Sequence, residues 1–328
     1  MLDQPEDSPF LSGTNIQFAW DSTSLGWAKT CPRLYYYNML CGYRPKDESV
    51  HLRFGIEYHT ALEEYDYFRA AGADHDEAEH LAVADLVERL KDYKDPDGEY
   101  AKPSEKVKTK ENLLRTVIWY LEEFKNDAAQ TYIKTDGKPA VEQSFRFELD
   151  FGPQATPETR HSTNKGIVAD QPYILCGHLD RIVNYNDGLF IMDRKTTTQT
   201  PGPYYFKKYD PDNQMTLYAY AGQVVLRSQI TGVLIDVAQV AVNGSKFVRG
   251  VSYRSPDQIE EWVRDLHVHL RTFERYAVEG YWPQNDTACD KFGGCRFRGI
   301  CSKSPSSRQM FLDNDFTQEE PWNPLKVR

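Results

Sequence analysis

The chain has 328 residues, 40% of them hydrophobic and 27% charged, a balance that predicts a folded protein with a sizeable core rather than a disordered one. Its formal net charge of −10, from 39 basic and 49 acidic side chains, argues against a protein that coats nucleic acid through bulk charge, but leaves room for a local basic groove. No apolar run is long enough to span a bilayer, and the acidic start MLDQPEDSPF lacks the basic and apolar regions of a signal peptide. We therefore expect a cytoplasmic protein with no membrane partner, whose six cysteines are reduced or metal-bound.

Residues 20–130 show helical periodicity. Apolar residues recur at helical spacing in VHLRFGIEYHTALEEYDYFRAAG, which ends at Gly72, and in DEAEHLAVADLVERLKDY. A third helix is expected in SEKVKTKENLLRTVIWYLEEFKND, with Ser104 as its N-cap. The lysines at 106, 108 and 110 are expected to form a solvated face of that helix.

Residues 139–280 alternate strand and helix signals. AVEQSFRFELDF reads as a strand with Glu142 on the opposite face from Val141. After a hairpin, a helix capped by Asp210 or Asp212, two strands (GVLIDVAQVAV and KFVRGVSY) and a long helix from Ser255 are expected. A cysteine-rich segment at 281–303 follows, and then a polar tail at 304–328 that we expect to be loosely ordered, because it has few apolar residues.

The hairpin GHLDRIVNYNDGLFIMDRKT is apolar in its middle but carries Asp180, Asp193 and Lys195 near its ends. If the turn is Asn186-Asp187, Asp180 lies opposite Asp193; if it is one residue later, Asp180 lies opposite Lys195. Either register gathers the three charges on one patch. Two carboxylates that close repel each other, and a divalent cation such as Mg²⁺ relieves the repulsion. The alternative is a structural ion pair with the lysine.

These residues, GHLDRI followed by MDRKT, resemble the PD-(D/E)XK nucleases, and specifically their RecB-like branch. That branch has an upstream helical histidine, for which FGIEYHTALEEY supplies His59, and a Gln-x-x-x-Tyr motif, for which QMTLY supplies Gln214 and Tyr218. The resemblance spans about residues 20–302. Without the other motifs, the flanking Ile56 and Leu62 would favour a core histidine that only satisfies a hydrogen bond.

The resemblance implies an α/β fold with a mixed central sheet flanked by helices, a restriction-endonuclease-like core with a helical N-terminal portion, in one nuclease domain over 1–303. It implies a deoxyribonuclease that uses Mg²⁺ or Mn²⁺. By resemblance, the metal is held by His59, Asp180, Asp193 and the main-chain carbonyl of Arg194, while Lys195 activates the attacking water. Gln214 and Tyr218 are the further catalytic residues. Glu142 is either a supporting residue or an ordinary solvated glutamate.

Four cysteines have the layout of a metal centre, with Cys31 far upstream of Cys289, Cys295 and Cys301. Nucleases of the AddB type and of the CRISPR-adaptation type, which this chain resembles, bind an iron–sulfur cluster with one early and three late cysteines. The resemblance therefore implies a 4Fe–4S cluster that ties the ends of the nuclease domain together. The first gap among the late cysteines is five residues where the family usually has two, and this leaves zinc open as the alternative.

The segment TTTQTPGPYYFKKYD interleaves aromatic and basic residues, so Tyr204 and Tyr205 could stack on bases while Lys207 and Lys208 meet phosphates; an ordinary loop is the equal alternative. We expect an exonuclease for single-stranded DNA ends, in recombination, repair or phage DNA metabolism. The alternatives are a structure-specific or CRISPR-adaptation endonuclease and, in another class, a catalytically silent DNA-binding subunit of a helicase–nuclease complex. Because the chain has no P-loop motif, any helicase or recombination protein would be a separate partner.

Overall fold

The computed structural model of the chain describes residues 8–46, 49–96, 99, 101–154, 171–291 and 294–326. The chain forms two compact units. The first unit comprises Met1–Asp47, Ser144–Gly177 and Pro256–Arg328, and the second comprises Glu48–Gln143 and His178–Ser255.

The second unit is built on a mixed sheet. Strand β5 (Ile174–Tyr185), which enters this unit at residue 178, forms an antiparallel hairpin with β6 (Gly188–Thr197). Strand β7 (Gly232–Ala241) runs parallel to β6, and β8 (Gly244–Ser252) runs antiparallel to β7. The short β3 (Gln130–Thr131) and β4 (Val141–Glu148) both pair with β5. Parallel and antiparallel pairs in one sheet confirm the expected α/β class with a mixed central sheet.

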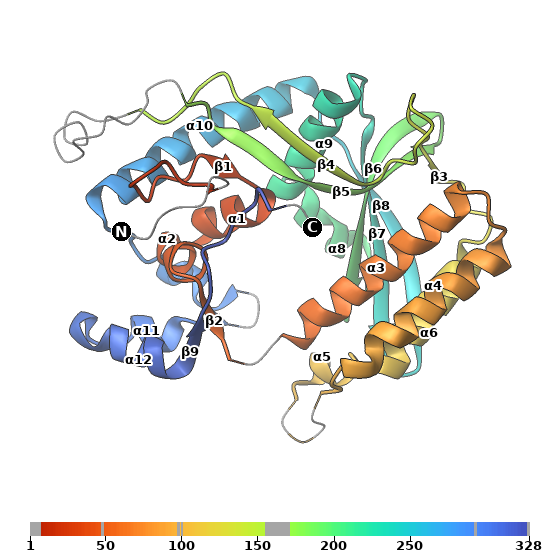
Figure 1. The fold of residues 1–328 in the computed structure, drawn as a ribbon, viewed down its shortest axis with the longest axis horizontal. Helices are drawn as coiled ribbons and strands as arrows, with labels where there is room; N and C mark the ends of the chain where they lie inside the picture. Colours follow the sequence, from red (N-terminus) through yellow and green to blue (C-terminus); the bar gives the residue numbers. More distant parts are fainter. Residues whose placement is uncertain are drawn as a thin grey trace. The chain divides into compact units, whose positions relative to one another are not determined.

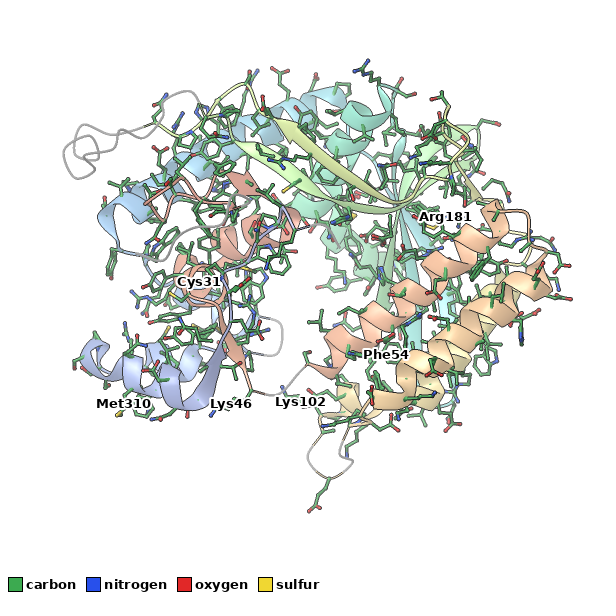
Figure 2. All side chains as sticks on the ribbon, in the orientation of Figure 1. Cys31, Lys46, Phe54, Lys102, Arg181 and Met310 are labelled. Atoms are coloured by element: carbon green, nitrogen blue, oxygen red, sulfur yellow. The ribbon has the colours of Figure 1, made fainter. Side chains whose placement is uncertain are left out.

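Helices cover both faces of this part of the sheet. On one face, α3 (Val50–Ala70), α4 (His75–Arg89) and α6 (Lys110–Glu123) lie side by side (Figure 1). Their buried side chains, among them Phe54 (labelled in Figure 2), form a core with Ala238 and Val240 of β7. On the other face, α9 (Asn213–Leu226) approaches β6 closely, because a Cβ at Gly222 would lie 2.7 Å from Ile191 Cδ1. Asp212 is the N-cap of α9: its side chain accepts a hydrogen bond from Met215 N at 3.0 Å.

The helix predicted from Ser104 is wrong at its start. A short helix, α5 (Pro103–Lys106), ends before α6, whose N-cap is Thr109. In a continuous helix, the carbonyls at this break would accept hydrogen bonds from backbone N–H groups. Here they accept from side chains instead: Tyr93 Oη donates to Lys108 O at 2.7 Å, and Asn112 Nδ2 donates to Val107 O at 2.8 Å.

Lys108, at this break, is not on a solvated face as predicted. It is 2% exposed, and its Nζ lies 4.0 Å from the Phe54 ring centroid and 3.3 Å from Thr196 Oγ1. Burial lowers the pKa of Lys108 to about 8.

The first unit contains the N-terminal helices, the long α10 (Pro256–Glu279) and the cysteine-rich segment. Strand β1 (Ala19–Trp20) runs parallel to the first residues of β5, with Ala19 paired to Ile174. The Trp20 ring packs on Phe273 of α10, with centroids 5.5 Å apart. The remaining elements here are α1 (Ser22–Thr30), α2 (Pro32–Tyr35), η1 (Tyr36–Leu40), η4 (Asp286–Ala288), α11 (Arg298–Cys301) and η6 (Pro305–Ser307). The second unit also has η2 (Leu90–Asp92), α8 (Pro203–Phe206) and η3 (Lys207–Tyr209).

The C-terminal tail is more ordered than its composition predicts. It forms α12 (Arg308–Asp315) and β9 (Phe316–Gln318), and β9 pairs antiparallel with β2 (Tyr43–Pro45). The few apolar residues of the tail are well placed: Leu312 is 2% exposed, and the Phe316 ring stacks on Phe297 at 4.8 Å. Backbone pairing and these contacts order residues 308–318, where composition alone suggested a loose segment.

None of the helices that the structure describes is both long enough and apolar enough to cross a membrane.

Candidate active site

The hairpin register that the sequence left open is settled by the turn. Tyr185 pairs with Gly188, so the turn is Asn186-Asp187, and both residues have positive φ (46° and 57°), as a two-residue hairpin turn of type I′ requires. The register continues to Arg181 opposite Met192. Asp180 and Asp193 come directly after this last pair. There the Asp180 carboxylate accepts the Arg194 N–H at 2.9 Å, which anchors that carboxylate beside β6.

Lys195 connects the strand to the helix that follows. Its Nζ lies 2.8 Å from Asp193 Oδ2 and donates to Gln214 Oε1 at 2.9 Å. Gln214 Nε2 in turn donates to Tyr218 Oη at 3.0 Å, because the two residues are one turn apart on α9. The four side chains form one hydrogen-bonded chain from the buried carboxylate to the helix.

His59 reaches the same place from α3. Its Nδ1 lies 3.4 Å from Asp180 Oδ2, and its ring hydrogen-bonds to the main chain of Arg194. Burial lowers the pKa of His59 more than the Asp180 carboxylate raises it. A neutral imidazole is the form that binds metal.

Burial and neighbouring charges affect the pKa values of Asp193 and Lys195 differently. Asp193 is 1% exposed, and burial raises its pKa to about 7, with the Asp180 charge adding to the rise and Lys195 opposing it. Burial works to lower the pKa of Lys195, but the carboxylates of Asp193 and Asp180 outweigh it and raise that pKa. The lysine is therefore charged, and Asp193 is a carboxylate that a second cation would help to ionise.

The donor set fits a divalent cation. The buried Oδ2 of Asp193 has the Lys195 ammonium as its ion-pair partner at 2.8 Å, and the carboxylate keeps lone pairs for a second cation. Two carboxylates, an imidazole and a main-chain carbonyl suit Mg²⁺ or Mn²⁺. Among the described residues, the ligand atoms of His59, Asp180 and Asp193 do not form a group within 4.8 Å, so a bound cation would draw them together by side-chain rotation.

Glu63 is a neighbour of the site that the sequence reasoning missed. It follows His59 by one turn of α3 and is half-buried. Burial raises the pKa of Glu63, the Arg194 charge opposes this, and the Asp180 charge adds to it. The i, i+4 spacing from His59 was the available signal.

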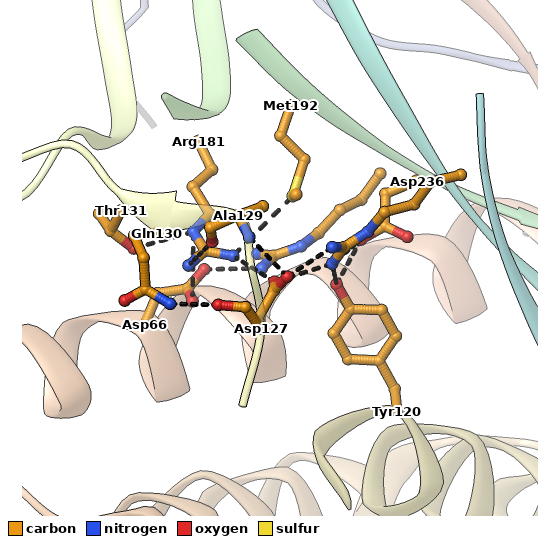
Figure 3. Close-up of polar contacts among 11 residues, drawn as sticks. Asp66, Tyr120, Asp127, Ala129, Gln130, Thr131, Arg181, Met192 and Asp236 are labelled. Atoms are coloured by element: carbon orange, nitrogen blue, oxygen red, sulfur yellow. Dashed lines mark hydrogen bonds and ion pairs between the residues drawn. The ribbon is translucent and has the colours of Figure 1, made fainter. Parts of the chain in front are cut away.

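Arg194 lies between two site residues in the chain but points to the other face of the sheet. Its Nη2 lies 2.7 Å from Asp66 Oδ2 of α3. Asp66 also forms an ion pair with Arg181, with 3.5 Å between Oδ1 and Nε. The network continues through further buried or nearly buried side chains (Figure 3), which are Asp127, Asp236, Arg249 and Tyr120. The positive charges of three arginines are thus matched by the negative charges of three aspartates beneath the site.

The proposed nucleic-acid contacts differ in exposure. Tyr204 is 88% exposed, whereas Tyr205 is 7% exposed and Lys208 Nζ lies 3.6 Å from its ring centroid. Tyr205 packs in the core and against Lys208, so the predicted stacking of the Tyr205 ring on a base is wrong for this conformation. Lys207 and Lys208 are exposed.

Glu142, at φ 43°, lies near Tyr67: burial raises the pKa of Tyr67, and the charges of Glu63 and Glu142 add to the rise.

The four cysteines of the predicted centre meet in the first unit. Cys31, Cys289, Cys295 and Cys301 all line one cavity of about 190 Å³. Asn285 holds the early cysteine beside the late ones, because its backbone N–H donates to Cys31 Sγ at 3.3 Å and its Nδ2 to Thr30 O at 2.9 Å. Cys176, by contrast, lies buried away from this group, with its Sγ 3.5 Å from Trp20 O.

Comparison with known proteins agrees with this geometry. Residues 22–302 match the family model of the PD-(D/E)XK nuclease superfamily, and the chain belongs to that superfamily. Among solved structures, it is similar to a provisionally assigned exonuclease from Eubacterium rectale, with 12% identity, a TM-score of 0.47 and coverage of 89% of this chain and 92% of that one. It is also similar to SSO0001, with 13% identity, a TM-score of 0.32 and coverage of 89% and 90%. No curated protein matched the sequence.

The protein is therefore a nuclease of a superfamily that uses divalent metals such as Mg²⁺ or Mn²⁺, with DNA as its substrate.

Proposed function

We propose that this nuclease is an exonuclease that removes nucleotides from single-stranded DNA ends, in recombination, repair or phage DNA metabolism. The observation that carries the catalytic part is the chain of contacts from Asp193 through Lys195 to Gln214 and Tyr218, beside the anchored carboxylate of Asp180. His59, Asp180, Asp193 and the Arg194 carbonyl would hold a divalent cation, which would supply Lewis-acid stabilisation of the phosphate charge. Lys195 orients the attacking water and stabilises developing negative charge.

The single-strand preference rests on Tyr204. Its ring is almost fully exposed, and the exposed Lys207 and Lys208 follow it closely in the chain. An unpaired base is free to stack on such a ring, and one stacking contact contributes about 1–3 kcal/mol. A duplex reader needs a broader basic surface for two backbones, which is harder to build with a net charge of −10.

The test is cleavage of one DNA sequence presented as a single-stranded circle, a linear single strand and a blunt duplex, at fixed Mn²⁺ and salt. We expect digestion of the linear strand only. Equal cleavage of the circle would make the protein an endonuclease, of the structure-specific or CRISPR-adaptation kind. A preference for the blunt duplex would refute single-strand entry.

Lys195→Ala is the control for a contaminating nuclease, and Tyr204→Ala should weaken the linear-strand preference without changing metal binding. Binding of DNA without cleavage of any substrate would identify the chain as a silent subunit of a helicase–nuclease complex.

We also propose that the four cysteines hold one 4Fe–4S cluster. They line one cavity of about 190 Å³, which has room for a group larger than a single ion. The cluster would join Cys31 to the segment that begins 258 residues later, at Cys289, and stabilise the first unit by closing a long loop.

Anaerobically purified protein should be brown and contain about four irons per chain by elemental analysis. Cys31→Ala should lose the colour and lower the thermal midpoint, while Cys176→Ala, a matched substitution of a buried cysteine outside the group, should keep the colour. Zinc in place of iron would support the alternative. A colourless protein without either metal would refute the centre.

A further inference from the structure

A second group of possible ligands lies on the helices of the second unit. His75 is the first residue of α4, and Glu79 follows it by one turn on the same helix. Glu122 comes from α6, which packs beside α4. One ligand atom of each residue lies within 4.8 Å of the other two. We propose that His75, Glu79 and Glu122 form a metal site that takes a divalent transition-metal ion such as Zn²⁺ and ties α4 to α6.

The spacing of the three side chains fits ligands better than hydrogen bonds. His75 Nε2 lies 3.3 Å from Glu79 Oε2 and 3.3 Å from Glu122 Oε1. Charge-assisted N–H···O bonds are usually about 2.7–2.9 Å long. Ligand atoms that each lie about 2.0–2.1 Å from a tetrahedral Zn²⁺ are separated by about 3.3–3.4 Å.

The histidine is held from behind, as metal-binding histidines usually are. His75 is 7% exposed, and its Nδ1 lies 2.9 Å from the hydroxyl of Tyr65 on α3. When Nδ1–H of a neutral imidazole donates to Tyr65, the Nε2 lone pair faces both carboxylates, and either a metal ion or a proton must lie between them. A protonated imidazole, which donates from both ring nitrogens, would make an ordinary ion-pair cluster instead, and the Zn²⁺ measurements distinguish it from a metal site.

The charge and the access of the site suit a dication. A neutral imidazole with two carboxylates has a net charge of −2. The side chain of Glu79 is 20% exposed and that of Glu122 is 55% exposed, and burial, the Glu122 charge and a hydrogen bond to Glu122 raise the pKa of Glu79. The hydrogen bond between the two carboxyl groups needs a shared proton, which a bound dication would replace. Both glutamates also line a hollow of about 510 Å³, which leaves room for water in the remaining coordination positions.

This site does not depend on the proposed exonuclease activity, because its residues are separate from the ligands of the active site. A metal here would join α4 to α6 and fix His75 against α3, the helix that carries His59. Its main consequence is therefore stability of the three-helix layer.

The experiment measures Zn²⁺ bound per chain and the Zn²⁺-dependent rise in thermal midpoint, for the full-length protein in an Asp180→Asn/Asp193→Asn background that weakens the catalytic site. We expect Glu122→Gln to lose one equivalent of Zn²⁺, or to bind it at least tenfold more weakly, and to lose part of the thermal shift. Glu123→Gln, an exposed neighbour on the same helix, should behave like its parent.

His75→Gln and Glu79→Gln should show the same loss, with Glu77→Gln on α4 as the matched control. Glu122 is largely exposed, so its variant keeps the test valid if the His75 variant does not fold. An ion-pair cluster predicts a different result: Glu122→Gln would change the midpoint without added metal, and Zn²⁺ stoichiometry and affinity would equal those of the parent. That outcome would overturn the proposal.

Discussion

Arg194 and Asp66 are joined by a contact of 2.7 Å between side chains that are each 3% exposed. Neighbouring residues on a strand point to opposite faces, so Arg194 faces α3 while Asp193 and Lys195 face the site. Helix α3 also carries His59. The ion pair therefore sets the position of β6 against the helix that supplies the histidine, and it acts on the site without touching it.

Asp66→Asn is expected to lower the free energy of unfolding by about 3–5 kcal/mol, because it leaves buried guanidinium groups without their carboxylate. Urea denaturation followed by circular dichroism measures this change. Asp136→Asn is the matched control: that side chain is 54% exposed, and its closest lysine contact is 3.9 Å, so we expect a change within about 0.5 kcal/mol. Similar small changes in both variants would show that the network contributes little.

Mg²⁺ or Mn²⁺ is expected to raise the thermal midpoint of the wild-type protein, because a ligand that binds only the folded state stabilises it by mass action. The rise should disappear in Asp180→Asn and Asp193→Asn, and both variants should lose cleavage. Asp187→Asn, which changes an aspartate in the turn of the same hairpin, should keep both properties. A normal metal-dependent rise in the Asp193 variant would contradict the assigned ligands.

Gln214→Leu is expected to reduce cleavage at saturating substrate by roughly 10–100-fold, because the Lys195 ammonium loses the acceptor at 2.9 Å that orients it. Tyr218→Phe removes only the hydroxyl 3.0 Å from Gln214 Nε2, so its effect should be smaller. Steady-state rates at several DNA concentrations separate these effects from weaker DNA binding. An effect on KM alone would move Gln214 from a positioning role to a binding role.

Lys108→Met is expected to stabilise the protein. The folded-state pKa of Lys108 is about 8 against an ordinary 10.5, so the charged lysine costs on the order of 3 kcal/mol at every pH below about 8. Between about pH 8 and 10.5 the unfolded chain keeps a proton that the folded chain has lost, and wild-type stability rises with pH.

The gain from Lys108→Met should accordingly be largest at pH 7 and fade towards pH 10.5. Unfolding free energies measured at pH 7, 9 and 10.5 check this, with Lys106→Met, in the preceding short helix, as the control. If the gain in unfolding free energy were the same at all three pH values, the charge on Lys108 would not destabilise the folded protein.

Local patterns in the sequence were sufficient for the helix at 50–70 and the long helix from Pro256, because periodicity, capping and turn residues act over a few neighbours. They narrowed the cap of the helix at 213–226 to Asp210 or Asp212, and the structure shows that it is Asp212. The same patterns indicated that Asp180, Asp193 and Lys195 belong to one patch. Resemblance to a family, rather than periodicity, indicated His59 and Gln214. Composition failed for the tail at 308–318, whose order depends on a pairing with residues 43–45.

Tertiary structure decided what depends on distant partners. The hairpin register needed both turn residues at positive φ, and its pairs run to Arg181 opposite Met192, directly beside Asp180 and Asp193. Lys108 is buried because Phe54 and Thr196 close over it from 54 residues before and 88 residues after it. Tyr205 faces the core while Tyr204 faces water, although the two are neighbours. The short spacing of His75 and Glu79 becomes a candidate metal site only when another helix brings Glu122 to them, since no local pattern encodes which side chain a distant helix presents.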